Sequence, residues 1–407
     1  MTTFEHPTAR TVVHPGTPQW TELLARIGAG AKDRDLNDEN PFDEVALLKQ
    51  AGFGTLRLST ELGGAGLTVP QLFSAVIDVA RADPVVAHIF RTHFWFVEER
   101  LRDTGPAGRA WLTRVADGRI FGNAFSEKGS QAVGSLVFNT RLLPAHDGGY
   151  TLTGEKFYST GTLFSDYLTV TATTDHDSLA TVVVPADRAG VELIDDWDGF
   201  GQRRTGTGTT KFKDVTVLPE ELLTDTPYDA APVPTVQYAA LQLFIHAVVA
   251  GILENVVDDG VALLRSRTRG FSHAIAEQPV DDPLLQRQLG ELASTAYIAR
   301  TAVIDAAAAI GAALDSAGPD GVPDAELAAA AQLAAAKVKV HLDDVAPQAA
   351  SRLLELGGAS AASRQRNLDR HWRNIRTITL HNPVGLKARV IGQNLLHGTE
   401  IPANAYF

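Results

Sequence analysis

The chain has 407 residues, 44% of them hydrophobic and 21% charged, which is the composition of a folded protein with two or three domains. A net charge of −12 disfavours nucleic acid and anionic membranes as general partners, because both attract basic surfaces. The lack of cysteine excludes disulfides, thiolate metal sites and a cysteine nucleophile, and it fits a cytoplasmic protein.

The sequence lacks several common signatures. Its first residues have no apolar core of the signal-peptide kind, and its apolar stretches are rich in alanine or interrupted by charge, so we expect no membrane span. Zinc-protease, phosphate-loop and dinucleotide-binding motifs are not found, and we expect no bound metal.

Residues 1–118 are predicted to form an α-helical domain. After a leader over residues 1–17, apolar residues recur at helical spacing between 19 and 52. A second helical run is predicted from Thr68 to about residue 101, with a restart at Asp83-Pro84.

Residues 119–228 have a different composition, rich in Thr, Val and Gly. Leu168, Val170 and Ala172 alternate with threonines, which predicts a half-buried strand in a small barrel or sandwich. Residues 229–407 return to helical patterns, with breaks near residues 270–282 and 317–324. We expect a four-helix bundle there, which is a natural oligomer interface. The predicted class is therefore α+β.

A segment after the strand-like residues 150–153 combines aromatic rings with small hydroxyl residues. Tyr158 is followed by Ser159 and Thr160, between Phe157 and Phe164. Aromatic rings can wall a flat ligand, and hydroxyl groups can bind its edge. Taken alone, the pattern also fits an ordinary strand–turn–strand.

The order of domains and motifs resembles the acyl-CoA dehydrogenase family. The loop Phe125-Ser126-Glu127-Lys128-Gly129-Ser130, the pair Gly154 and Lys156, the segment Tyr158-Ser159-Thr160 and the loop Gly201-Gln202-Arg203 follow one another as in that family. The resemblance covers nearly the whole chain. It implies a flavin protein with an N-terminal helical domain, a central β domain and a C-terminal four-helix bundle.

One departure from this family bears on the reaction. Dehydrogenases of the family use a glutamate as base after an arginine-rich helix end, and here Arg373–Arg376 is followed by His381 and Asn382. Asn382 stands at the position of the glutamate, and an amide cannot abstract a proton. Residues 358–364, the other place where such a base occurs, contain no acid. We therefore expect no family-type dehydrogenation.

Three segments, residues 157–166, 196–208 and 370–384, resemble the branch that contains the dibenzothiophene monooxygenases and sulfur-acquisition oxidoreductases. The resemblance implies a two-component monooxygenase that receives FMNH2 from a separate NADH-dependent flavin reductase. With O2 it would form a C4a-hydroperoxyflavin that oxygenates a small apolar or aromatic heteroatom substrate, first of all an organosulfur compound. The alternatives are an N-oxygenase (a hydroxylase or nitrososynthase) acting on an amine or amino sugar, an FAD acyl-CoA dehydrogenase with a relocated base, and a catalytically silent flavin-binding module.

The same resemblance assigns roles to individual residues. Those expected to contact the flavin are Ser126, Ser130, Tyr158, Ser159, Thr160 and Trp197. The expected catalytic residues are His381, Ser159, His88 and Asn382, with His381 preferred because imidazole can donate or accept a proton near neutral pH. His88 and His93 would point about 140° apart on one helix, so that at most one faces a given cleft.

Two further expectations concern the FMN phosphate and the exclusion of water. Arg269, with Arg267 as alternative and Lys128 as a helper, is expected to bind the phosphate of a neighbouring subunit's FMN, which implies a homotetramer built as a dimer of dimers. The residues expected to keep water from the flavin are Phe90, Phe94, Trp95, Phe96 and Trp197.

Overall fold

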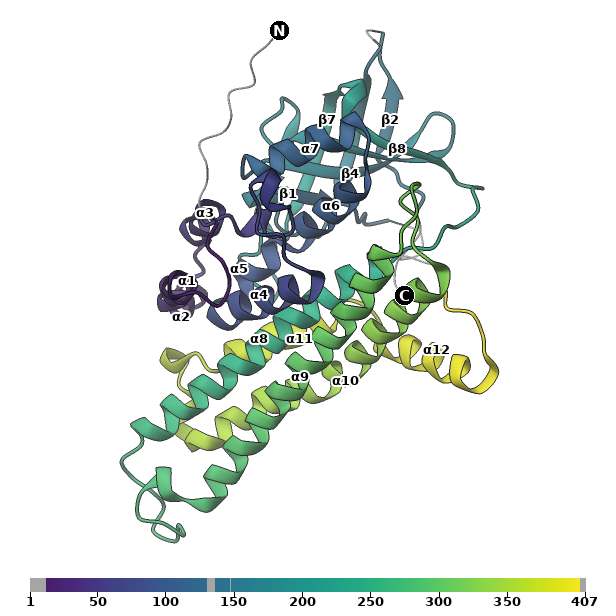
Figure 1. The fold of residues 1–407 in the computed structure, drawn as a ribbon. Coiled ribbons are helices and arrows are strands. Elements are labelled where there is room, and N and C mark those ends of the chain that lie inside the picture. The colour runs from purple at the N-terminus through teal and green to yellow at the C-terminus, as the bar shows by residue number, and fades with distance from the viewer. Residues whose placement is uncertain (1–11, 130–135, 147, 403–407) are drawn as a thin grey trace.

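The computed structural model describes residues 12–129, 136–146 and 148–402, and its helical and sheet domains are seen in Figure 1. The N-terminal helices are α1 (Pro18–Ala29), α2 (Ala31–Asn37), α3 (Phe42–Gln50), α4 (Val69–Ala82), α5 (Pro84–Ile89), α6 (Arg91–Arg102) and α7 (Pro106–Ala116). The predicted N-terminal α-helical region is therefore present. Helix α4 shows why these segments fold locally, since Thr68 and Gln71 form a capping box at its start.

The helical run expected through residues 83–101 is divided at Phe90. Asp83 caps α5 by accepting hydrogen bonds from the amides of Val85 and Val86, and α5 ends after six residues. Helix α6 starts anew at Arg91. His88 and His93 therefore lie on different helices, and the angle calculated for a single helix does not apply to them.

The central domain forms one mixed sheet. Its strands are β1 (Phe121–Ala124), β2 (Arg141–Pro144), β3 (Tyr150–Lys156), β4 (Tyr167–Thr174), β5 (Ser178–Pro185), β6 (Val191–Ile194), β7 (Thr209–Val217) and β8 (Leu222–Pro227). The order is β6-β7-β3-β2-β4-β5-β8, with β1 parallel to β4. Strand β4 is buried along most of its length, because it pairs with β5 on one side and with β1 and β2 on the other.

The C-terminal domain is a bundle of long helices. They are α8 (Gln237–Ser266), α9 (Pro283–Asp315), α10 (Ala325–Gly357), α11 (Asp369–Thr379) and α12 (Val384–His397). Helix α10 continues through Pro347. Helix α12 was not expected from the sequence, and Figure 1 shows it projecting beside α10.

Helices α8 and α9 are long and apolar enough to cross a membrane by length and composition alone. The most apolar stretch of α8 is 72% buried inside the structure and that of α9 is 44% buried. These helices pack against each other and against α10, as core helices do.

Two of the three apolar clusters connect the domains. The largest cluster joins α1, α4, α5 and α6 to α8, α9 and α10, so the two helical domains share one core. A second cluster fills one face of the sheet. A third, which includes Phe96, Trp111, Phe121 and Val183, attaches α6 and α7 to the sheet. The junction of the three domains is therefore fixed by apolar packing.

Candidate active site

The segment after β3 forms a tight turn against the N-terminal helices. Tyr158 has a positive φ of 57° and Gly161 one of 84°. A Cβ at Gly161 would lie 2.6 Å from the Ile89 carbonyl oxygen, so the turn approaches the end of α5 more closely than a side chain would allow. The amide of Ser159 donates to the Gly208 carbonyl oxygen at 3.1 Å, while its side-chain Oγ is buried and has no hydrogen-bond partner.

Thr160 and Tyr158 occupy different environments on this turn. The Thr160 hydroxyl contacts that of Thr207 at 2.8 Å. The Tyr158 ring is 57% exposed and meets the edge of Trp197 at a centroid distance of 6.1 Å. The structure thus places Tyr158 and Trp197 together at an accessible edge.

The loop that contains Ser126 is tied to this turn. The Ser126 carbonyl oxygen accepts a 2.8 Å hydrogen bond from the Phe157 amide. Glu127 forms a 2.7 Å ion pair with the fully buried Lys156, and Lys128 lies 4.2 Å from the centre of the Phe157 ring. Burial lowers the pKa of Lys156 to about 8, although Glu127 acts in the opposite direction. Ser130 lies outside the described residues.

His88 is held from one side only. Its Nδ1 is 2.9 Å from Gln202 Oε1, and its Nε2 is buried with no hydrogen-bond partner. Burial, with the nearby charge of Arg91, lowers the pKa of His88 to about 4. The imidazole is therefore neutral at physiological pH.

His93, the alternative to His88, is engaged on both sides. Its Nε2 contacts the Gly54 carbonyl oxygen at 2.8 Å, and its Nδ1 accepts from the Phe121 amide at 3.3 Å. Burial lowers its pKa to about 4 as well. Both ring nitrogens serve to join α6 to the turn after α3 and to β1, which is a structural role.

His381 and Asn382 lie in the turn after α11. His381 Nε2 is 3.5 Å from an Arg91 nitrogen, and its Nδ1 is 3.5 Å from the Asn382 amide nitrogen. The surrounding protein and then the charge of Arg91 hold the pKa of His381 well below its usual value, although water reaches part of the ring. Asn382 is buried and its Oδ1 has no partner.

A buried polar chain continues from Asn382 into the bundle. Asn382 Nδ2 donates to Gln242 Oε1 at 2.8 Å, and Gln242 contacts His246. His246 Nε2 lies 3.0 Å from Asp343, which also pairs with the fully buried Lys339 at 2.6 Å. This chain fixes the orientation of the Asn382 amide from behind.

Three of the four predicted catalytic residues share one structural feature. Ser159, His88 and Asn382 each present a buried polar atom without a hydrogen-bond partner. The end of α5 contacts the turn at Gly161, and His88 is among the charges that act on the His381 pKa. Buried polar groups are normally satisfied, so these atoms fit a polar ligand held where the three domains meet. A flavin ring edge, which offers both donors and acceptors, suits this set.

The predicted phosphate ligand lies elsewhere in the subunit. Arg269 is exposed in the connection between α8 and α9, at the end of the bundle that is distant from the sheet (Figure 1). Arg267, the alternative, donates to the Leu356 carbonyl oxygen at the end of α10. Arg269 therefore does not join the residues that meet around His88 within one subunit.

The predicted apolar wall is divided among several environments. Phe94 and Trp95 line a small apolar cavity of about 20 Å³ together with Arg91 and Phe244. Phe90 packs into the main core, and Phe96 stacks on Phe121 at a centroid distance of 3.9 Å. Only the first pair faces the cavity beside Arg91.

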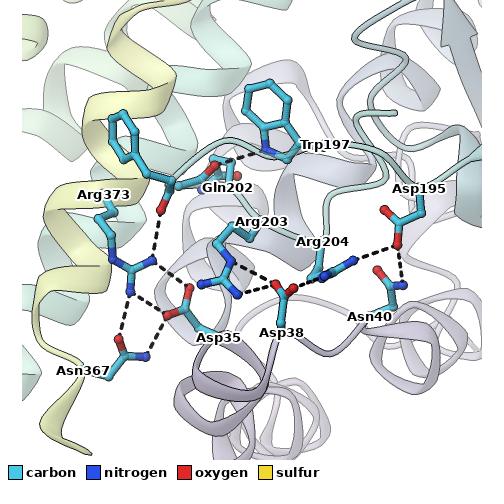
Figure 2. Close-up of polar contacts among 12 residues, drawn as sticks. Asp35, Asp38, Asn40, Asp195, Trp197, Gln202, Arg203, Arg204, Asn367 and Arg373 are labelled. Atoms are coloured by element: carbon cyan, nitrogen blue, oxygen red, sulfur yellow. Dashed lines mark hydrogen bonds and ion pairs between the residues drawn. The ribbon is translucent and has the colours of Figure 1, made fainter. Parts of the chain in front are cut away.

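Sequence reasoning did not assign a site role to Gln202. This residue belongs to the loop over residues 195–204, which Figure 2 shows between the N-terminal helices and α11. Arg203 and Arg204 both pair with Asp38, and the Gln202 amide donates to Asn374 Oδ1 at 2.7 Å. Asp38 and Asn374 are far from this loop in the chain, so no local pattern could have revealed these contacts.

Comparisons with known proteins agree with the geometry. Residues 123–215 match the middle domain of acyl-CoA dehydrogenase, and residues 243–384 match its C-terminal domain. A dibenzothiophene monooxygenase of Mycolicibacterium goodii is 30% identical over 92% of both chains. The probable FMNH2-dependent monooxygenase SfnC of Pseudomonas putida is 28% identical over 95% of both.

A solved structure also aligns over nearly the whole fold. FMN-bound TdsC from Paenibacillus sp. A11-2 superposes with a TM-score of 0.86 at 28% identity, covering 95% of this chain and 98% of that one. The same three-domain arrangement is therefore found in an FMN-binding protein. This chain belongs to the acyl-CoA dehydrogenase family, in the branch that contains the dibenzothiophene monooxygenases.

Proposed function

We propose that this chain is the oxygenase component of a two-component flavin monooxygenase that oxidises a small organosulfur substrate. The observation that carries the proposal is the set of unpartnered polar atoms on Ser159, His88 and Asn382, at a junction where the family's carboxylate base is replaced by an amide. An amide can orient a ligand but cannot remove a carbon-bound proton.

The residues around the junction suit a reduced FMN. The Ser159 hydroxyl, which has no partner in the protein, can bind the ring, and the Ser126 loop, tied to Phe157, lies beside the same turn. When bound, reduced FMN supplies the electrons that activate O2. FMN and O2 are thus the cofactor and co-substrate, and the flavin comes from a separate NADH-dependent reductase.

The two histidines are suited to holding a proton rather than to carrying a permanent charge. His88 has a pKa of about 4, and the pKa of His381 is also lowered, so both rings are neutral at pH 7. A neutral imidazole can accept a proton at one nitrogen and donate one at the other. We assign His381 the proton transfer at the reacting atoms, with Asn382 orienting a polar group beside it.

The substrate class follows from the apolar surroundings and the relatives. Phe94 and Trp95 place apolar surface next to Arg91, which agrees with an apolar substrate, but the cavity there, about 20 Å³, is too small to hold one. The relatives named for dibenzothiophene oxidation point to sulfur before nitrogen. The largest charges that act on His381 come from Arg91 and Lys339, so a relocated carboxylate base finds no support there.

The decisive experiment supplies the purified protein with FMN, NADH, a general flavin reductase and O2. A panel containing aromatic thioethers, an alkane sulfinate and primary amines is then analysed by mass spectrometry. Addition of one oxygen atom to a sulfur compound supports the proposal. Oxidation of the amines alone would identify an N-oxygenase instead, and release of H2O2 with no product from any substrate would refute an oxygenase function for these compounds.

We further propose a cytoplasmic homotetramer in which Arg269 binds the FMN phosphate of a neighbouring subunit. Its exposed position far from its own subunit's junction supports this arrangement. Replacing Arg269 with Ala should raise the Kd for FMN roughly 10- to 150-fold, since one charge-assisted hydrogen bond contributes about 1.5–3 kcal/mol. An unchanged Kd, measured by fluorescence titration, would remove this residue from the phosphate site.

A further inference from the structure

The loop over residues 195–204, here called the latch loop, is held in an unusual backbone conformation. Three of the seven described non-glycine residues with positive φ belong to the latch loop or contact it directly: Asp38 at 62°, Gln202 at 50° and Arg204 at 67°. Side chains rarely adopt this region unless their surroundings impose it, and such positions gather at functional sites.

Ion pairs and hydrogen bonds impose the conformation from both sides. Asp38 forms ion pairs with Arg203 and Arg204, and these three residues are here called the Asp38 clamp. Arg204 also pairs with Asp195 at 2.9 Å. On the opposite side, Arg373 donates to the Phe200 carbonyl oxygen at 3.1 Å, as Figure 2 shows. The arginines Arg204 and Arg203 lower the pKa of Asp38 to about 2, so the clamp stays charged at neutral pH.

The backbone of the latch loop also touches α11 directly. A Cβ at Gly201 would overlap the Arg373 carbonyl oxygen, so this position requires glycine. The next residue, Gln202, is 2% exposed and its amide donates to Asn374 Oδ1. The loop is therefore held in place at Gly201 and at Gln202, whose side chain contacts His88.

The contact between Gln202 and His88 has a chemical consequence. Gln202 Oε1 lies 2.9 Å from His88 Nδ1, and a carbonyl oxygen can only accept a hydrogen bond. With the amide in this orientation the proton of the neutral imidazole resides on Nδ1; the reversed amide, whose Nε2 is buried without a partner in the structure, would instead place it on the imidazole Nε2. With the proton on Nδ1, the lone pair on His88 Nε2, which is buried without a partner, is left to accept.

We propose that Gln202 is a positioning residue that holds His88 as the Nδ1–H tautomer, and that the Asp38 clamp keeps Gln202 in place. His88 Nε2 then acts as a hydrogen-bond or proton acceptor towards the ligand at the junction. The catalytic consequence rests on the proposed oxygenase function, whereas the tautomer is a property of the flavin-free protein.

Other charged groups face His88 and must be considered in any test. Arg91 on α6 opposes protonation of the ring, and His381 lies close enough to interact with it. Neither group selects a tautomer by a hydrogen bond to Nδ1. The Gln202 carbonyl oxygen is the acceptor at that nitrogen.

The tautomer is measured by magic-angle-spinning NMR of flavin-free protein containing ¹³C,¹⁵N-histidine. His88→Ala identifies the His88 signals by their loss. The wild type should show a neutral Nδ1–H ring at pH 7, and Gln202→Glu should retain it, because a carboxylate also accepts from Nδ1–H. Gln202→Met, similar in shape but without a strong acceptor, should convert much of the population to Nε2–H.

Two results would overturn the proposal: an Nε2–H ring in the wild type, or a Gln202→Met spectrum identical to it. Asp38→Asn tests the clamp, because Asn tolerates the positive φ but cannot pair with two arginines. It should give mixed tautomers with Gln202 unchanged. A single wild-type tautomer in Asp38→Asn would remove the clamp from the proposal.

Activity separates positioning from simple structural support. Gln202→Met should lower the product formed per reduced FMN at least about tenfold and release the difference as H2O2, with the Kd for FMN within about twofold of wild type. Gln202→Glu should restore most of the product and move the acidic limb of the pH profile upward, because a carboxylate raises the pKa of His88. Equal losses in both variants would indicate a structural role. If the wild type oxygenates nothing, the proposed function fails while the tautomer result still stands.

Discussion

Removing the charge of Glu127 should destabilise the folded chain by up to about 1.4 kcal/mol at pH 7, because the buried Lys156, whose folded pKa is about 8, loses its counter-charge and must release its proton. Lys156 is fully buried, and its Nζ lies 2.7 Å from Glu127 and 3.8 Å from the centre of the Phe138 ring. In Glu127→Gln the lysine keeps the aromatic contact but loses its counter-charge.

Two variants provide matched controls for this change. Glu155 neighbours Lys156 on β3 and pairs with Lys211 on β7 at 3.6 Å, where both side chains are nearly half exposed, so Glu155→Gln should cost no more than about 1 kcal/mol. Lys156→Met leaves Glu127 with hydrogen bonds from the Asn139 amide and from the amide and hydroxyl of Thr140. It should therefore cost less than Glu127→Gln.

The pH dependence gives the sharper test. The pKa of Lys156 is about 8 in the folded protein and must fall further without Glu127. Between the folded pKa of Lys156 and its unfolded pKa of about 10.4, the unfolded chain binds a proton that the folded lysine has released. Stability therefore rises with pH in this range. The difference between Glu127→Gln and wild type should shrink once pH exceeds 8, where both folded lysines are neutral.

The assay is urea unfolding followed by tryptophan fluorescence at pH 7 and pH 9.5. Glu127→Gln should unfold at clearly lower urea than wild type at pH 7 and close to it at pH 9.5. A loss of equal size at both pH values, or one no larger than that of Glu155→Gln, would contradict the electrostatic reasoning.

Three further predictions concern the junction and the histidines. His381→Ala should lower product formation at least about tenfold while leaving the Kd for FMN within about twofold, and an equal loss of both would mean that His381 only supports the fold. Wild-type stability should fall as pH drops from 6.5 towards 4, because His93 has a folded pKa of about 4 and is protonated first in the unfolded chain. The contribution of His93 to this loss of unfolding free energy is about 2 kcal/mol by pH 5. His93→Gln should flatten this slope in urea titrations, whereas the same change at the exposed His176 should not. Gly161→Ala should lower the melting temperature and weaken FMN binding more than Gly63→Ala, since both residues have a positive φ but only Gly161 lies against a carbonyl oxygen; equal effects would show that the contact with Ile89 is unimportant.

The order of domains could be predicted because it depends on local patterns. Helical spacing in the first and last thirds of the chain and alternation along Leu168–Ala172 persist over many residues, and tertiary contacts did not reverse them. The turn at Ser159 was recognised from its residues. Its closeness to α5 could not be, because that depends on Gly161 meeting Ile89 from another domain.

Other features were decided by contacts between distant segments. The division at Phe90 occurs in a sequence that reads as one helical run, and it separates His88 from His93. The positive φ of Gln202 has no local signal, since glutamine has little preference for that region. Its causes are Asn374 and the clamp on Asp38, each more than 160 residues away.

Helix α12 was missed for a different reason. It begins directly after Asn382-Pro383, and those residues were interpreted only as part of a motif. Proline is nevertheless well suited to precede a first helical turn. The same residues therefore form the motif and precede the helix, and assigning them to the motif alone left the helix unpredicted.

An amide rather than a carboxylate at residue 382 fits the polar chain behind it. Asn382 Nδ2 donates to Gln242 Oε1, while the other end of Gln242 contacts His246, which is joined to Asp343. A glutamate at this position would bring an acceptor against Gln242 Oε1. The buried chain therefore favours an amide at residue 382, and a site organised in this way favours orientation of a bound polar group over abstraction of a carbon-bound proton.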